Sequence, residues 1–228
     1  MRRAIAQRMT ASKQQAPHFY ESADIEMDAL LALLAAHNGG REKDDRASVT
    51  AALVVALAAA LRAHPAFNAV WNGEELELVD AVNVGIAVEL PDGLIAPALL
   101  NCGGLDIDTA AAALRDLVTR SRAKRLRAVE LTDATFTLSN LGMFPIDSFT
   151  AIVVPPQVAI LATARASERA VVRDGAVTVR RVMTATLSAD HRAVDGAAAA
   201  RFLADLKGSL EQPAALFEAR PPEAVPKS

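Results

Sequence analysis

The sequence has few of the residues that indicate nucleic-acid binding, disulfide bonds or metal ligation. Aromatic residues make up 4% of the 228 residues and the net charge is −3, so we expect no nucleic-acid partner. The one cysteine, Cys102, excludes a disulfide within the chain and favours a reducing, cytoplasmic setting. It is expected to be a passive thiol, because free cysteine usually behaves as a small hydrophobic residue. No metal site is expected, since no second histidine lies near His191 in the sequence.

Long apolar runs and several enzyme motifs are also missing. The N-terminus lacks the apolar core of a signal peptide. The most apolar run, residues 51–61, has about half the length that a membrane span needs, so it predicts a buried helix and no membrane partner. Neither Gly-x-Ser-x-Gly nor a phosphate-binding glycine-rich loop occurs, which counts against a serine esterase and a nucleotide-dependent enzyme.

The hydrophobic pattern predicts a mixture of helices and strands. Helices are expected over residues 1–14, 28–36, 48–62, 106–126 and 196–210. Extended segments are expected over residues 20–25, 82–90, 94–100, 135–139, 158–163 and 183–188, with hairpins over 67–79 and 171–179. Because these elements do not alternate strictly, the sequence predicts an α/β two-layer sandwich with a mixed β-sheet rather than a doubly wound parallel sheet.

His191 differs from the other histidines because it lies between a predicted strand and a predicted helix. Such a turn fixes the backbone and can project a side chain into a cleft. Asp195, four residues later, can lock the local geometry, and Gly196 allows close backbone packing. From position alone, His191 is either a general base or only a hydrogen-bonded turn residue.

A second candidate site is the end of the predicted strand 135–139. Thr137, Ser139 and Asn140 bring hydroxyl and amide donors together there, and preorganised donors can stabilise an oxyanion. The alternative is a polar strand end with ordinary turn chemistry, and position alone favours that alternative.

The segment Ser-Ala-Asp-His-Arg-Ala-Val-Asp-Gly, residues 188–196, resembles the His-Arg-x-x-Asp-Gly signature of the dihydrolipoamide acyltransferases. These enzymes form the cores of the 2-oxo acid dehydrogenase complexes. Other segments resemble the same family in the same order: residues 3–9, 17–20, 92–97, 135–142 and 155–161. The resemblance covers roughly residues 2–217, and residues 63–67 also resemble the related chloramphenicol acetyltransferases.

The resemblance implies a chloramphenicol acetyltransferase-like fold, with a catalytic domain over residues 1–217 and a C-terminal tail over 218–228. It implies homotrimers with active sites between subunits, assembled into a 24-mer or 60-mer core. Decarboxylase and dihydrolipoamide dehydrogenase components are the implied partners. The family's lipoyl and subunit-binding domains are not in these residues, and a start so close to the core favours excision from a longer chain.

The resemblance also implies a role for each matching residue. His191 matches the base that deprotonates a thiol, Ser139 matches the hydroxyl that stabilises the oxyanion, and Asp195 matches the aspartate that orders the site. Ser139 would come from a neighbouring subunit. The residues expected to contact substrate are Asp92, Gly93 and Asn140. CoA and dihydrolipoamide are the implied substrates, with no tightly bound cofactor.

Departures from the family pattern concern the acyl group more than the chemistry. Pro145 stands where a glycine is usual, and residues 153–156, Val-Val-Pro-Pro, replace an Ile-Asn-Pro-Pro type of run. Both can reshape the loop near Ser139. Residues 24–28 and 142–144 resemble acetyl or branched-chain types. The alternatives are an acetyltransferase acting on a small hydroxyl and a scaffold core without catalysis.

Overall fold

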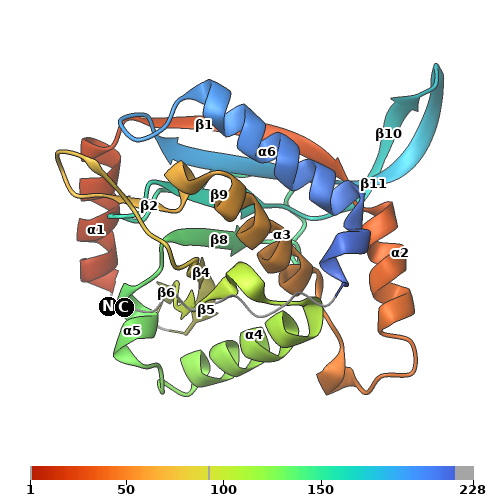
Figure 1. Ribbon diagram of the computed structural model, residues 1–228, viewed down its shortest axis with the longest axis horizontal. Coiled ribbons are helices and arrows are strands. Elements are labelled where there is room, and N and C mark those ends of the chain that lie inside the picture. The colour runs from red at the N-terminus through yellow and green to blue at the C-terminus, as the bar shows by residue number, and fades with distance from the viewer. Residues whose placement is uncertain (1, 92, 219–228) are drawn as a thin grey trace.

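The computed structural model describes residues 2–91 and 93–218, which form a mixed β-sheet with helices packed on one face (Figure 1). The α-helices are α1 (Arg2–Gln15), α2 (Asp28–His37), α3 (Val49–Ala63), α4 (Ile107–Arg122), α5 (Ala128–Thr132) and α6 (Gly196–Glu211). Short 3-10 helices cover Lys43–Asp45, Pro65–Phe67, Cys102–Gly104 and Pro213–Leu216. The strands are β1 (His18–Glu26), β2 (Ala69–Trp71), β3 (Leu76–Leu78), β4 (Val84–Ile86), β5 (Val88–Leu90), β6 (Gly93–Ile95), β7 (Ala98–Leu99), β8 (Phe136–Asn140), β9 (Ala159–Thr163), β10 (Ser167–Arg173) and β11 (Ala176–Asp190).

The main sheet has seven strands in the order β1-β11-β9-β8-β4-β7, with β10 paired to β11. Strand β8 is parallel to both β4 and β9, whereas the other pairs in this sheet are antiparallel. Two separate pairs, β2–β3 and β5–β6, form small sheets of their own. A mixed sheet beneath one layer of helices confirms the predicted α/β sandwich.

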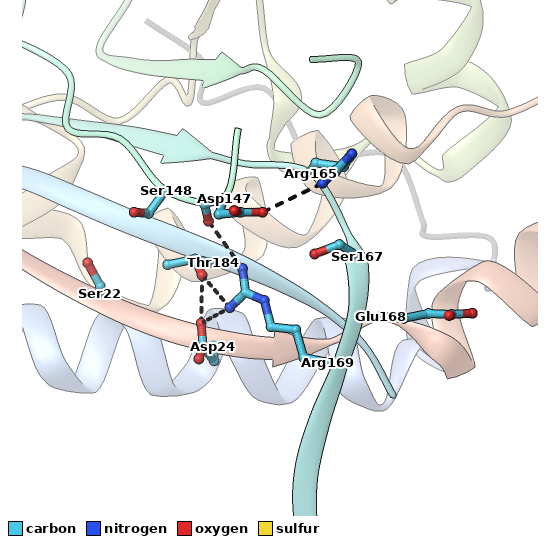
Figure 2. A pocket seen from close by; sticks show the side chains of 9 residues that line it. All are labelled: Ser22, Asp24, Asp147, Ser148, Arg165, Ser167, Glu168, Arg169 and Thr184. Carbon is cyan, nitrogen blue, oxygen red and sulfur yellow. Dashed lines mark hydrogen bonds and ion pairs between the residues drawn. The ribbon is translucent and has the colours of Figure 1, made fainter. Parts of the chain in front are cut away.

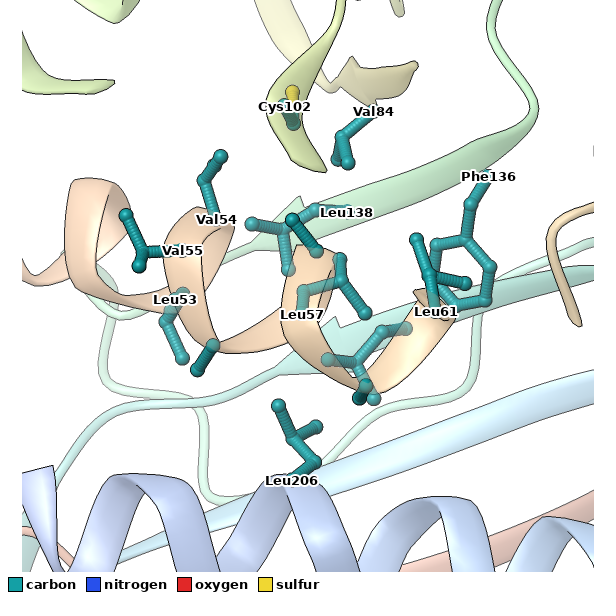
Figure 3. Packing of buried hydrophobic residues seen from close by; sticks show 14 of the residues in the cluster. Leu53, Val54, Val55, Leu57, Leu61, Val84, Cys102, Phe136, Leu138 and Leu206 are labelled. Atoms are coloured by element: carbon teal, nitrogen blue, oxygen red, sulfur yellow. The ribbon is translucent and has the colours of Figure 1, made fainter. Parts of the chain in front are cut away.

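Helix α3 is the centre of the core. Residues 43–63 are long and apolar enough to cross a membrane by length and composition. In the structure, however, ten residues of α3 are buried, and the helix packs against α4 and α6 over the sheet (Figure 3). The Ser48 hydroxyl caps it by accepting a hydrogen bond from the Ala51 N–H at 3.1 Å. The buried helix predicted from residues 51–61 is therefore confirmed.

Strand β11 separates an apolar face of the sheet from a polar one. Ala185 and Leu187 lie in the hydrophobic core, and they alternate with Thr186 and Ser188 on the opposite face. The Ser22 hydroxyl of β1 hydrogen-bonds with the Thr186 hydroxyl across this polar face at 2.9 Å. One face of β11 thus stabilises the fold, while the other carries groups that can form hydrogen bonds.

Several predicted element boundaries differ from the structure. The extended segment expected over 82–90 contains two strands in different sheets, because β4 pairs with β8 while β5 leaves the main sheet to pair with β6. The helix predicted over 106–126 ends at Arg122, and Lys124 follows with a positive φ of 57°. The predicted tail, residues 218–228, lies almost wholly outside the described residues.

The predicted hairpin over 171–179 is confirmed. Asp174 and Gly175 connect its strands with φ angles of 50° and 78°, as a two-residue turn with two left-handed residues requires. Its second strand does not end at residue 179. It is part of β11, which runs for 15 residues from Ala176 to Asp190, so the strand predicted over 183–188 lies in the second half of the same strand.

Helix α5 is held to α4 by a buried carboxylate, Glu130, which the sequence analysis did not identify. Its side chain is 2% exposed and accepts hydrogen bonds from the Arg120 guanidinium at 2.6 and 2.8 Å. The Arg127 N–H and guanidinium add bonds at 2.7 and 2.8 Å. The bonds from Arg120, aided by those from Arg127, lower the pKa of Glu130 to about 2 and outweigh the opposing effect of burial.

We predict that Glu130→Gln lowers the free energy of unfolding by about 2 to 4 kcal/mol at pH 7, because it leaves the Arg120 guanidinium without its buried partner. The folded-state pKa lies below the ordinary value of 4.5, so the stabilisation is complete above pH 4.5 and is lost as the pH falls towards 2. Denaturant titrations between pH 2 and 7 measure both effects. The exposed Glu74→Gln is the control, and equal stabilities of the two variants would contradict the prediction.

Candidate active site

His191 lies on a tight turn between β11 and α6. The Ala193 and Val194 N–H groups donate to the Asp190 carbonyl at 3.0 and 3.2 Å, and the His191 N–H donates to the Pro17 carbonyl at 3.0 Å. The imidazole is exposed and contacts the Phe19 ring, with 4.8 Å between the ring centroids. The strand-to-helix turn predicted from the sequence is therefore present, and its imidazole is accessible from outside the chain.

Asp195 begins helix α6. Its carboxylate accepts a hydrogen bond from the Ala198 N–H at 2.7 Å, which is an N-cap interaction. Between these two described residues no hydrogen bond joins Asp195 to His191. The structure thus supports an ordering role for Asp195, acting through the backbone of the turn and the helix.

Glu21 of β1 is a neighbour of this turn that the sequence analysis missed. A Cβ atom on residue 196 would lie 2.9 Å from the Glu21 Oε1, so the glycine at the start of α6 lets this carboxylate approach the helix without moving. Burial and, to a smaller extent, the charge of Asp195 raise the pKa of the Glu21 carboxyl. No local pattern could have shown this contact, because it joins segments 175 residues apart in the sequence.

Ser139 lies near the end of β8, at a cavity of about 570 Å³. Leu94 and Asn140 line the same cavity. The side-chain amide of Asn140 donates to the Thr50 hydroxyl at 3.0 Å, and its oxygen accepts from the Gly142 N–H at 2.8 Å. Within the described residues the Ser139 hydroxyl has no hydrogen-bond partner, so it is available to a bound group.

The wall of this cavity is mostly apolar. Besides Ser139 and Asn140, the polar groups that line it are Thr50, Glu89 and Arg122. The apolar lining consists of Ile86, Ala87, Val88, Leu94, Leu114, Val118, Leu138, Leu141, Met143 and Phe144. Gly93 begins β6, next to Leu94, whereas Asp92 lies outside the described residues. The predicted substrate segment therefore reaches the cavity of Ser139 through Leu94.

One chain does not bring His191 and Ser139 together. Ser139 pairs with Ala162, which pairs with Thr186, so Ser139 is level with Thr186 in the sheet. His191 lies five residues beyond Thr186, past the opposite end of the sheet, and two strands away. At about 3.3 Å per residue and 4.8 Å per strand, the two residues lie roughly 19 Å apart. Any site that uses both side chains needs two copies of the chain.

A larger pocket, about 660 Å³, lies on the polar face of the sheet (Figure 2). Its central cation, Arg169, donates to the Asp24 carboxylate at 3.2 Å, the Thr184 hydroxyl at 3.0 Å and the Asp147 carbonyl at 3.2 Å. These groups satisfy one another, and none of the predicted site residues lines this pocket. It is therefore not a candidate for the reaction centre.

Cys102 is buried, and its thiol donates to the Leu99 carbonyl at 3.0 Å. Burial raises its pKa to about 12, so very little thiolate exists at neutral pH. Among the described residues, no group of three or more histidine, cysteine, aspartate or glutamate side chains is placed to hold a metal ion.

Comparison with known proteins matches residues 1–218 to the family of 2-oxoacid dehydrogenases acyltransferase (catalytic domain). The chain is 39% identical, over 216 residues, to the mitochondrial dihydrolipoyllysine-residue acetyltransferase component of the pyruvate dehydrogenase complex from Schizosaccharomyces pombe. The match covers 93% of this chain and 45% of that protein. The chain thus spans about half the length of the curated relatives that it matches.

Solved structures show the same fold. The dihydrolipoamide acetyltransferase of Azotobacter vinelandii aligns with a TM-score of 0.90 and 32% identity, covering 95% of this chain and 90% of that chain. The cubic core of a pyruvate dehydrogenase multienzyme complex gives the same four values. A chloramphenicol acetyltransferase aligns with a TM-score of 0.58 and 14% identity over 93% of this chain and 94% of that chain, which supports the predicted fold type alone.

We predict that Cys102 reacts with a thiol reagent such as dithiobis-nitrobenzoate only after unfolding. At pH 8 a thiol of pKa about 12 is ionised in roughly one molecule in ten thousand, and burial also blocks the reagent. The chain has no other cysteine, so the colour change reports this residue alone. Cys102→Ala with the exposed Ser148→Cys should react completely in the folded state. Rapid labelling of folded wild-type protein would show that Cys102 is not passive.

Proposed function

The chain belongs to the 2-oxoacid dehydrogenase acyltransferase family, and from this premise we propose that it transfers an acyl group between the thiols of CoA and dihydrolipoamide. The observation that carries this proposal is the placement of His191 and Ser139. An exposed imidazole on a rigid turn is suited to be a base, and an unpartnered hydroxyl beside an apolar cavity is suited to bind an oxyanion.

The Azotobacter vinelandii enzyme provides independent support. A serine, a histidine and an asparagine are described in its catalytic mechanism. The serine stands 52 residues before the histidine and the asparagine four residues after it. Ser139 and Asp195 have the same spacing from His191. The departure is Asp195 in place of the asparagine, and an aspartate oxygen performs the N-cap bond seen here.

In the proposed reaction, His191 removes the proton from the attacking thiol, which is mostly protonated at neutral pH because an ordinary thiol has a pKa of about 8.5. The sulfur bonds to the thioester carbonyl carbon, and the carbonyl oxygen becomes an oxyanion. The Ser139 hydroxyl donates to that oxyanion, a contribution of about 3 to 4 kcal/mol for one such donor. Collapse breaks the original carbon–sulfur bond, and the leaving thiolate takes the proton back from His191.

The proposed active unit contains more than one copy, since His191 of one copy must meet Ser139 of the next, and the family resemblance makes that unit a homotrimer. The similarity to a cubic core supports further assembly of such trimers, into a 24-mer or a 60-mer. The relatives are components of the pyruvate dehydrogenase complex, which supports decarboxylase and dihydrolipoamide dehydrogenase components as partners. A single buried thiol fits a cytoplasmic setting.

We predict that His191→Ala and Ser139→Ala each lower kcat for acyl transfer from acetyl-CoA to dihydrolipoamide by at least about a hundredfold. Mixed trimers should regain activity, because some interfaces join an intact histidine from one variant to an intact serine from the other. Random mixing of equal amounts makes about one interface in four competent. The measurement is transfer kinetics after joint refolding of the two variants.

The control for mixing is each variant refolded alone, at the same total concentration. If wild-type trimers transfer acyl groups and His191→Ala does so nearly as fast, the proposed chemistry is wrong. Inactive wild-type assemblies would favour the scaffold alternative. Transfer to a small hydroxyl acceptor in place of dihydrolipoamide would favour the acetyltransferase alternative. If the jointly refolded variants are no more active than either variant alone, the result would indicate that both side chains act in the site of one subunit.

The apolar wall of the Ser139 cavity favours an acetyl or branched-chain acyl group. A succinyl carboxylate would lose its hydration there, which is costly unless the charge is paired. We predict that kcat/KM for acetyl-CoA and isobutyryl-CoA exceeds that for succinyl-CoA by at least about tenfold. If succinyl-CoA is used equally well, Arg122→Gln shows whether pairing at the cavity is the reason.

A further inference from the structure

The two residues that flank His191 bond to each other. Asp190 ends β11 with a side chain that is 3% exposed. The Arg192 Nε and Nη2 groups donate to its two carboxylate oxygens at 3.0 and 2.6 Å, and the Arg192 N–H adds a bond at 3.0 Å. Two parallel bonds from a planar guanidinium to one carboxylate fix orientation as well as distance.

A third residue covers the guanidinium. The Arg192 Cζ lies 5.1 Å from the centre of the Trp71 ring, which is cation–π geometry. Trp71 belongs to the small β2–β3 sheet, and its backbone N–H donates to the Pro156 carbonyl at 2.8 Å. An isolated bridge between Val70 and Gln157 holds the same strand to the same segment. The backbone that carries the indole is therefore fixed from outside the catalytic turn, whereas the buried indole N–H has no hydrogen-bond partner among the described residues.

His191 itself has little to hold it. Its backbone bonds to Pro17, its ring contacts Phe19, and its side chain is exposed, as a base that must meet two substrates requires. We propose that Asp190, Arg192 and Trp71 are positioning residues, which set the orientation of His191 by fixing the turn from both sides. The inference rests on the proposed function of His191, and none of the three residues takes part in the chemistry.

Direct substrate binding by Arg192 is the rival explanation. A guanidinium that binds a phosphate or carboxylate of the substrate needs free donors and an uncompensated charge. Here Asp190 occupies two of its nitrogens and neutralises its charge, and Trp71 covers one face. The geometry therefore favours a role through the turn, and the two roles differ in which kinetic constant they change.

The test measures kcat and both KM values in assembled Arg192→Lys, which keeps the charge but cannot form the two parallel bonds. We expect kcat to fall at least about tenfold, with KM for CoA and dihydrolipoamide within about twofold of wild type. Trp71→Leu should lower kcat several-fold, and Trp71→Phe should restore most of it. Because Trp71 acts through Arg192, the double variant Arg192→Lys with Trp71→Leu should be no slower than Arg192→Lys alone.

Matched controls are Arg201→Lys on the exposed side of α6 and Leu78→Ala on the β2–β3 sheet. Unchanged kcat in Arg192→Lys, a rise in the KM for CoA alone, or losses that multiply in the double variant would each overturn the inference. If Arg192→Lys does not assemble, the comparison of Trp71→Leu with Trp71→Phe decides. His191→Ala separates the two hypotheses, because its activity tests the proposed function and not the positioning residues.

Discussion

The pairing of β11 with β1 on one side and β9 on the other determines where the candidate catalytic side chains lie. Antiparallel pairing with β1 brings His18 opposite Asp190, which leaves His191 just beyond the end of the sheet. Pairing through β9 places Ser139 level with Thr186. Because a register is fixed along a whole strand, the two side chains cannot approach each other without unpairing the centre of the sheet.

This separation explains why each half of the site is incomplete by itself. His191 faces solvent. In solvent, a hydrogen bond from the Ser139 hydroxyl to an oxyanion would compete with hydrogen bonds from water. Ser139 borders a mostly apolar cavity, and no histidine is among the described residues that line it. In the proposed trimer the imidazole of one chain would lie against the cavity of the next, where water is excluded and electrostatic stabilisation is stronger. Catalysis by the proposed site would therefore depend on assembly.

Local pattern predicted the elements that carry the site but not their partners. The apolar run of α3, the turn at Asp174 and Gly175, and the turn that carries His191 could all be predicted, because each depends on neighbouring residues in the sequence. The division of residues 82–90 between two sheets could not be predicted, because the alternation of side chains is the same in either sheet. Glu21 and the Arg192–Trp71 contact were missed because they join distant segments. The family motif selected His191 and Ser139 as candidates, whereas their separation within one chain became known only from the register of β11.

The exposure of His191 has a mechanical consequence. In the proposed reaction the base must serve two bulky thiol substrates and cannot be enclosed, and in the described part of the chain its imidazole packs against the Phe19 ring. The orientation of the imidazole must then be set by the backbone of the turn. That backbone is held in turn by the side chains of Asp190 and Arg192, which bond to each other. A buried carboxylate at Asp190 is costly unless it is paired. Its pairing with Arg192 removes that cost and closes the turn at the same time. The polar face of β11, which contributes little to the core, is where such a pair can be placed.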